Sequence, residues 1–335
     1  MMRSNWHDRL NALSTHAGGG IVGRQKKMIS DTQFIISTNE DGLRLDAVVV
    51  AHFPATTRLL AQRAIAAGDV TVDGKASHKG AKVCAGMSVC VKKLPESNDL
   101  RVLPDATMAL EILFEDADLV AANKPAGMDV HPLRPEEQGT LANGLVARWP
   151  ELAEVGDQPL MAGVVHRIDG DTSGLVLAAR NQAAFQGIRA QFAAHTVRKE
   201  YVALVAGAME KDTGKLENEL VHQPWRRGRM VDARRLKNPE RPMRAVTEFK
   251  VARKVGKFTL LDVTIFTGVT HQIRCQLALA GHAIVGDTLY GGVVVKNFPR
   301  HFLHASAVEL RQPRTGDALR IEAPLTPDLR EFLGK

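Results

Sequence analysis

The stretch GVVHRIDGDTSGLVLAAR, from Gly163 to Arg180, decides the fold of the larger part of this chain. One apolar run enters it at Gly163–Ile168 and a second leaves it at Leu175–Ala179, and both predict buried strands. The six residues between them, DGDTSG, are short or lack a side chain, so the backbone can come close to a ligand there. Asp169 stands where the first predicted strand ends. The residues alone also allow a simple turn whose aspartates bond their own backbone.

Strand and helix patterns continue on both sides of this stretch. Three more runs of β-forming residues predict strands at Leu119–Ala122, Tyr201–Ala206 and Phe258–Phe266. Asn181 can cap a helix over NQAAFQGIRAQFAAH. The run THQIRCQLALAG predicts another helix, which turns Ile273, Leu277 and Ala280 inward. From residue 105 to 335 the pattern therefore predicts an α+β domain on a mixed or antiparallel sheet.

A smaller α/β module is predicted over residues 31–95. Apolar residues at helical spacing begin at Leu45. Thr56 or Thr57 can cap a second helix, TTRLLAQRAIAA, which Gly68 ends. The run VTVDGKA leads β-forming residues into an Asp-Gly turn, which predicts a hairpin. Five cations of this module could meet phosphate groups: Arg58, Arg63, Lys75, Lys79 and Lys82.

Composition marks the boundaries of the two units. Residues 1–30 mix Gly, Ser, His and basic side chains without apolar periodicity, so we expect a mobile basic tail. Residues 96–104 are mostly polar and follow Pro95, which indicates a linker. The larger domain then occupies 105–335.

The distribution of charge says more than its total. Of the 335 residues, 44% are hydrophobic and 24% charged, as in soluble globular proteins. The net charge is +7, yet residues 1–30 carry +4, 56–93 carry +5 and 222–244 carry +6, whereas the rest carries −8. Positive charge gathered in runs is typical of a phosphate-binding surface, although any single run could be merely solvated.

The sequence also bears on the compartment. No apolar run approaches the roughly 20 residues of a membrane span, and the first residues lack the apolar core of a secretory signal. The three cysteines, Cys84, Cys90 and Cys275, form no CxxC pair. We therefore expect reduced thiols and a cytoplasmic protein.

Two families resemble this chain. HRIDGDTSGLVL is similar to the HRLDxxTSG signature of RNA pseudouridine synthases of the RluA/RluD type, with Ile168 in place of the usual Leu. Further pieces follow in that family's order: NKPAGMDVHP from Asn123, KEYVALV from Lys199, RAVTEF from Arg244, THQIRCQLA from Thr270, GH from Gly281, VGDTLYG from Val285 and FLHA from Phe302. The smaller module resembles the RNA-binding domain named after ribosomal protein S4, through RLD from Arg44, TR at Thr57, GDVTVDGK from Gly68 and GMSV from Gly86.

The resemblance implies an enzyme that isomerises uridine to pseudouridine in structured RNA. It makes Asp169 the catalytic carboxylate, Arg274 its ion-pair partner and Tyr201 a site tyrosine that accepts the proton from C5 of the base or stacks on it. A carboxylate needs such a cation to stay ionised in a dry pocket. Arg167 could fill the space that a flipped uridine leaves, or hold a phosphate. Val269 departs from the family, which usually has Arg or Lys there.

Two other functions are weighed against this one. An RNA-binding protein without chemistry would not need a buried carboxylate–guanidinium pair, which is expensive to hide. A hydrolase would need a second carboxylate across the scissile bond, and Asp171 is the only close candidate.

The remaining expectations concern cofactors and partners. The histidines form no HExxH and no tight cluster with cysteine, so we expect no metal and no other cofactor. His166 and Asp169, three apart on a strand, would face opposite sides. By analogy with the family, the partner is ribosomal RNA of the large subunit rather than transfer RNA, and a monomer is favoured.

Overall fold

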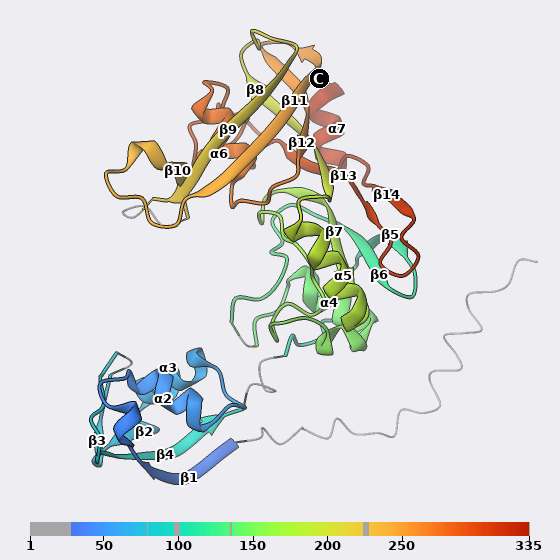
Figure 1. Ribbon diagram of the computed structural model, residues 1–335. Coiled ribbons are helices and arrows are strands. Elements are labelled where there is room, and N and C mark those ends of the chain that lie inside the picture. Colours follow the sequence, from blue (N-terminus) through green and yellow to red (C-terminus); the bar gives the residue numbers. More distant parts are fainter. Residues whose placement is uncertain (1–27, 79, 97–100, 135, 224–227, 335) are drawn as a thin grey trace, which may run out of the picture. The chain divides into compact units, whose positions relative to one another are not determined.

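The computed structural model describes residues 28–78, 80–96, 101–134, 136–223 and 228–334. Lys79, one of the candidate phosphate-binding residues, lies outside them, as does most of the expected tail. The described residues divide into two compact units, one before and one after residue 100 (Figure 1). Each unit has a hydrophobic core of its own. No helix among the described residues is long and apolar enough to span a bilayer.

The smaller unit is an antiparallel sheet of four strands in the order β1-β4-β2-β3. The strands are β1 Met28–Ile35, β2 Val70–Val72, β3 Lys75–Ala76 and β4 Ser88–Pro95. Its helices are η1 Thr38–Glu40, α2 Leu45–His52 and α3 Arg58–Ala67. Apolar side chains of α2 and α3 pack with those of the sheet in one core. Strands β1 and β4 were not predicted from the sequence. The first residues of β1 belong to residues 1–30, which were expected to form a mobile tail.

Local chemistry explains how these elements begin and end. Thr57, not Thr56, caps α3, because its Oγ1 accepts the N–H of Leu60 at 3.3 Å. Gly68 follows α3 with φ 79°, a left-handed conformation that glycine adopts without strain. Asp73 and Gly74 have φ 48° and 73°, as a type I′ hairpin turn requires. The two predicted helices and the hairpin are all present.

The larger unit is built on one ten-stranded sheet, in the order β10-β9-β11-β12-β8-β13-β7-β6-β5, with β14 paired to β13. The strands are β5 Glu111–Glu115, β6 Leu119–Lys124, β7 Ser173–Ala179, β8 Arg198–Ala206, β9 Thr213–His222, β10 Met230–Asp232, β11 Met243–Val255, β12 Phe258–Ile265, β13 Leu303–Arg311 and β14 Ala318–Glu322. Among the described strands, β13 and β7 pair in parallel and the other pairs are antiparallel. The predicted α+β class is confirmed.

The sheet is buried on both faces around β7. Val176 and Ala178 belong to one apolar core, and Leu175 and Leu177 belong to another. This alternation is that of a strand covered on both sides. Residues of α4 Leu141–Arg148 belong to the first core, and residues of α5 Gln182–Ala193 belong to the second.

Four further helices of the larger unit are described. They are η3 Pro150–Glu154, η4 Ala233–Arg235, α6 Gln272–Leu279 and α7 Pro327–Gly334. Figure 1 shows α6 beside β9 and β10, against which it packs. Asn181 caps α5, as predicted, by accepting the N–H of Ala184 at 2.9 Å. Ala280, expected to point inward from α6, is exposed, because α6 has ended and Gly281 turns the chain away with φ 88°.

Residues 163–168 do not form the strand that their apolar pattern predicts. Ala162 and Gly163 have φ 46° and 73°, which interrupts an extended backbone, and a single bridge between Val164 and Ala178 joins the segment to the sheet. Beyond it, Nε2 of His166 accepts the N–H of Leu177 at 3.0 Å, in the place of a neighbouring strand's carbonyl. The segment is therefore a loop held by a side chain.

Candidate active site

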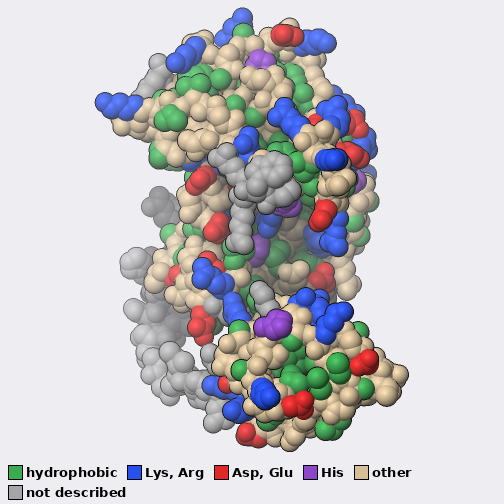
Figure 2. Space-filling view, turned by 90° about the vertical axis from the view of Figure 1, so that its left-hand side faces the viewer, with side chains coloured by type: hydrophobic (Ala, Val, Ile, Leu, Met, Phe, Trp, Pro, Cys, Tyr) green, Lys and Arg blue, Asp and Glu red, His purple; other side chains and the backbone are tan. Residues whose placement is uncertain are grey.

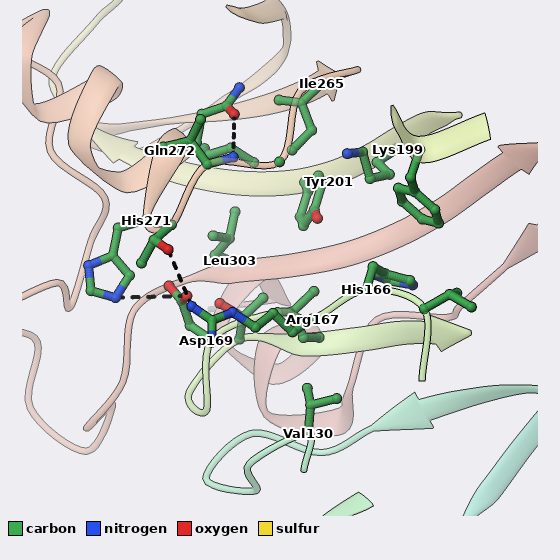
Figure 3. Close-up of a pocket in the computed structure, with 18 of the residues that line it drawn as sticks. Val130, His166, Arg167, Asp169, Lys199, Tyr201, Ile265, His271, Gln272 and Leu303 are labelled. Carbon is green, nitrogen blue, oxygen red and sulfur yellow. Dashed lines mark hydrogen bonds and ion pairs between the residues drawn. The ribbon is translucent and has the colours of Figure 1, made fainter. Parts of the chain in front are cut away.

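A cavity of about 600 Å³ opens in the larger unit at the start of β7. Its walls come from the loop before β7, the segment 129–133, α5, β8 and the chain that leads into α6 (Figure 3). Arg167, Asp169, Tyr201 and Arg274, chosen from the sequence, all line it. The fold thus brings together residues from three separate parts of the chain, the loop before β7, β8 and α6.

Arg274 joins Asp169 to a second carboxylate, Asp287. Its Nη1 donates to Oδ2 of Asp169 at 2.7 Å, while its Nε and Nη2 donate to the two oxygens of Asp287 at 2.6 and 2.9 Å. A bidentate pair of this kind fixes the plane of the guanidinium. Arg274 is 8% exposed and Asp287 only 1%. Asp287 is therefore an internal support that aims one N–H of Arg274 at Asp169.

His271 approaches Asp169 from the other side. It is the N-cap residue of α6, with φ 53°, and its Nε2 lies 3.8 Å from Oδ1 of Asp169. Its Nδ1 lies 3.1 Å from the hydroxyl of Tyr290, which accepts the N–H of Met230 at 2.8 Å. The hydroxyl can therefore donate its own proton to Nδ1, which leaves the Nε2–H turned toward Asp169 (Figure 3).

These neighbours decide the charge of Asp169. Burial raises the pKa of its carboxyl, but the charges of His271 and Arg274 and the hydrogen bond from Arg274 outweigh burial and leave that pKa below its ordinary value. The side chain is 24% exposed toward the cavity. An ionised carboxylate thus faces a partly enclosed space.

Two histidines, His301 just before β13 and His304 on β13, hold the run that follows Asp169. Oγ1 of Thr172 lies 2.7 Å from Nε2 of His301, and Oγ of Ser173 lies 2.9 Å from Nδ1 of His304. Nε2 of His304 donates to the carbonyl of Ala323 at 3.2 Å. Because that nitrogen carries the proton, Nδ1 accepts the hydroxyl proton of Ser173. Both hydroxyls of the TSG run are therefore satisfied within the protein.

Close packing explains the glycine that ends this run. Gly174 has φ 114°, and a Cβ there would lie 2.2 Å from the carbonyl oxygen of Ala305 on β13. A larger residue would push β7 away from its parallel neighbour. Gly174 therefore seats the loop against the centre of the sheet.

Lys124 is a site residue that sequence reasoning missed, although it lies in the NKPAGMDVHP run. Its side chain is fully buried, and burial lowers its pKa to about 7. Its Nζ donates at 2.7–2.8 Å to three backbone carbonyls, those of Pro125, Met128 and Gly170. Because Gly170 follows Asp169, this lysine ties the aspartate loop to the end of β6. Asp287 and His271 were missed as well, since their contacts are long-range.

Tyr201 lies in the middle of the cavity wall, on β8 (Figure 3). It is 8% exposed, and burial, with the charge of Asp169, raises the pKa of its hydroxyl. The phenol is therefore protonated at neutral pH and offers a ring and a hydroxyl to a ligand. Arg167 is exposed at the mouth and donates from Nη2 to Oγ1 of Thr270 at 3.3 Å.

Other sequence expectations can now be placed. Asp171 is exposed and is not part of the cavity wall. His166 and Asp169, expected on opposite faces of a strand, both line the cavity, because their segment is a loop. Val269, where the family usually has Arg or Lys, is half-buried against an apolar cluster that includes Cys275 and Tyr290, and it lines the cavity. Among the described residues, no group of three or more metal-ligating side chains is arranged to hold a metal ion.

The cations of the smaller unit differ in availability. Arg63, Lys75 and Lys82 are exposed. Arg58 is exposed as well, but it also donates twice, at 3.3 Å, to the fully buried carboxylate of Asp46, which other hydrogen bonds hold. On the face drawn in Figure 2, positive and negative side chains are interspersed. Ion pairs therefore neutralise part of the charge that the basic runs suggest.

Comparison with known proteins identifies the class of both units. Residues 118–279 match the RNA pseudouridylate synthase family, and residues 43–89 match the S4 domain. The structure resembles human RNA pseudouridylate synthase domain containing 1, with a TM-score of 0.54 and 24% identity over 68% of this chain and 88% of that one. This likeness concerns the fold.

Relatives of similar length strengthen the assignment. An uncharacterised RNA pseudouridine synthase of Bacillus subtilis, YlyB, is 35% identical over 89% of this chain and 95% of its own length. The ribosomal large subunit pseudouridine synthase D of Nitrosomonas europaea is 36% identical over 90% and 86%. The chain belongs to the RNA pseudouridine synthase family, an isomerase with an N-terminal S4 RNA-binding domain, and the resemblance predicted from the sequence is confirmed.

Proposed function

We propose that this enzyme converts uridines of large-subunit ribosomal RNA to pseudouridine with Asp169 as the catalytic carboxylate. The observation that carries the proposal is the ionised Asp169 at 2.7 Å from Arg274, inside a cavity of about 600 Å³. The ribosomal target is inferred from relatives of Nitrosomonas europaea and Neisseria meningitidis, which are named ribosomal large subunit pseudouridine synthase D.

The reaction makes few demands on a protein. The bond between C1′ of the ribose and N1 of uracil breaks, the base turns, a bond forms between C1′ and C5, and the proton on C5 leaves. Atoms balance without an oxidant or a second substrate. The electron-poor C1′ needs a negative partner, and Asp169 supplies it as nucleophile or as electrostatic stabiliser.

The neighbours of Asp169 have separate roles in this proposal. Arg274 keeps the carboxylate ionised, because its charge and its hydrogen bond counter burial, and the Nε2–H of neutral His271 lies 3.8 Å from the same carboxylate. Tyr201 stacks on the base, and its hydroxyl relays the C5 proton by passing its own proton to solvent in the same step, or the proton leaves through a solvent chain beside it. Flipping the uridine out of its stack costs a few kcal/mol. Exposed Arg167 fills the place that the uridine has left.

The S4 domain increases the affinity for RNA and takes no part in catalysis. Its exposed cations Arg63, Lys75 and Lys82 meet phosphates, whereas Arg58 supports Asp46. On this proposal the protein works as a monomer where ribosomes are made, in the cytoplasm.

A pseudouridine map of total RNA tests the proposal. RNA from cells with and without the gene is mapped, and cells with the gene restored are the control. We expect specific pseudouridines of the large-subunit RNA to disappear and return. Loss confined to transfer RNA would overturn the ribosomal target, and an unchanged map would overturn the proposal.

A further inference from the structure

One end of the cavity takes no part in the chemistry proposed above. It lies on the side of α5 and is lined by His166, Arg189, Phe192, His195 and Lys199. Figure 3 shows His166 and Lys199 at this end, with Tyr201 and Asp169 between them and His271. The end is walled by four side chains that can donate hydrogen bonds and by one aromatic ring, that of Phe192.

Lys199 is a buried cation that lines the cavity, with its Nζ 5.3 Å from the centroid of the Phe192 ring. It lies on β8, two residues before Tyr201, and is 5% exposed. Its Nζ donates to the carbonyls of Phe266 at 3.3 Å and Thr267 at 2.8 Å, which leaves one of its three protons. Within the described part of the chain, no carboxylate forms an ion pair with it. Burial lowers its pKa to about 8, as expected of an ammonium that lacks an anion.

His166 presents a neutral donor beside this cation. Its Nε2 accepts the N–H of Leu177, so the proton of the neutral ring is on Nδ1. Burial lowers the pKa of His166 to about 3, and the ring is uncharged at neutral pH. Among the described residues, Nδ1 has no hydrogen-bond partner, and it is not enclosed. The ring therefore offers a fixed N–H to whatever enters the cavity.

We propose that this end of the cavity binds a phosphodiester group of the RNA strand, held by Nζ of Lys199 and the Nδ1–H of His166, with Arg189 at the rim. A cation, a neutral donor and an exposed guanidinium without a carboxylate suit an anion better than the carbonyl of a base. The inference rests on the proposed function only in that the ligand is RNA.

The location identifies which phosphate is meant. His166 and Asp169 are three residues apart, and such a segment spans at most about 10 Å. The phosphate therefore belongs to the target uridine or to its immediate neighbour. A contact there would hold the ribose of the target while its base turns.

Two variants remove the two donors separately. Lys199→Met removes the charge and keeps the length of the side chain. His166→Gln removes the Nδ1–H and keeps an acceptor for Leu177. Lys250→Met, at an exposed lysine of β11, is the control for loss of one charge. All three are made in the full-length chain with Asp169→Asn, so that binding is measured without turnover.

The first measurement is affinity for transcribed large-subunit ribosomal RNA at pH 7.5. We expect Lys199→Met to weaken binding about 10- to 100-fold, the range for a hydrogen bond to a charged group, and His166→Gln to weaken it several-fold. Lys250→Met should change affinity little. If Lys199→Met matches Lys250→Met, the inference is overturned.

The second measurement is the pH dependence of the same binding, which a merely structural role would not produce. Free Lys199 has a pKa of about 8, and a bound phosphate raises it, so binding above pH 8 takes up a proton. The other charged or titratable groups of this wall are His166, Arg189 and His195. Ile265 and Val308, which pair with Lys199 on the neighbouring strands, are apolar.

Affinity should therefore fall by up to about tenfold between pH 8 and pH 9, and this fall should be absent in Lys199→Met. An identical fall in both proteins would contradict the inference. Turnover of the parent enzyme on the same RNA tests the proposed function separately. No turnover together with the expected binding effects would refute the activity and leave the phosphate site standing.

Discussion

Replacement of Arg274 by alanine is the perturbation that the structure specifies most closely. Arg274 makes three charged hydrogen bonds, two to Asp287 and one to Asp169. Alanine leaves both carboxylates without that partner. We expect the variant to lose both stability and activity, and we expect the loss to depend on pH.

The size of the loss follows from burial. Removal of one partner of a buried ion pair costs about 3–5 kcal/mol, and Asp287, 1% exposed, belongs to this class. Asp169, 24% exposed, adds less, because solvent screens it. Domains are stable by about 5–15 kcal/mol, so the variant should fold but unfold at much lower urea. Arg274→Lys keeps the charge, loses the bidentate geometry and should lose about 1.5–3 kcal/mol, the contribution of one charged hydrogen bond.

The pH dependence has a definite sign. In the parent protein the folded-state pKa of Asp169 is depressed, so its contribution to stability is present above the unfolded pKa and is lost as pH falls through the folded value. Without Arg274, burial is opposed only by the remaining charges, and protonation relieves the stranded carboxylate. The stability difference between parent and Arg274→Ala should therefore shrink from pH 7 to roughly pH 4, near the unfolded pKa of aspartate.

Urea unfolding of both proteins at several pH values, with Arg274→Lys alongside, measures this difference. The parallel kinetic assay is the pH–rate profile, whose acid limb should move to higher pH in the alanine variant. An equal stability difference at all pH values, with an unchanged pH–rate profile, would refute the pairing of Arg274 with Asp169.

Three further predictions concern other parts of the enzyme. Tyr201→Phe should still break the glycosidic bond and then stall, so single-turnover assays should find a broken intermediate, and full multiple turnover would leave the ring only a stacking role. Lys124→Met should lower kcat more than it raises KM, because it leaves the Gly170 carbonyl beside Asp169 without its hydrogen bond, and each unsatisfied buried carbonyl costs about 1–3 kcal/mol. An unchanged kcat would show that the loop keeps its conformation without Lys124. The last prediction concerns three exposed cations of the S4 domain, Arg63, Lys75 and Lys82. Their joint replacement by alanine should flatten the slope of log affinity against log salt by about two to three, at 0.7–0.9 per phosphate contact, and an unchanged slope would remove them from the RNA interface.

Local signals in the sequence predicted much of the fold. The helix ends at Thr57, Gly68 and Asn181 were predicted correctly, because a helix cap depends on neighbours within a few residues. Strands β6, β7, β8 and β12 followed from runs of β-forming residues. The strand predicted at 163–168 was wrong. There the side chain of His166, and not a strand carbonyl, accepts the N–H of Leu177, and an apolar pattern does not reveal such a contact.

The site was predictable only in part, for a related reason. Asp169, Tyr201 and Arg274 stand in runs that resemble a family, whereas the roles of Lys124 and Asp287 depend on contacts between distant segments. Both were inside quoted motifs, and a buried lysine or aspartate has no signature of its own in a sequence. The contact of Arg58 with Asp46, twelve residues away, was not foreseen either, and its contact with RNA stays a prediction.

The central claim is that Asp169 performs the chemistry, and Asp169→Asn tests it most directly. The change replaces one carboxylate oxygen by an amide of similar size, so the Arg274–Asp287 pair should persist and affinity for RNA should stay within a few-fold. Pseudouridine formed per enzyme in the mapped ribosomal RNA is the measurement. We predict none above background for the variant at saturating enzyme, and retention of more than a few per cent of the parent turnover would contradict the account.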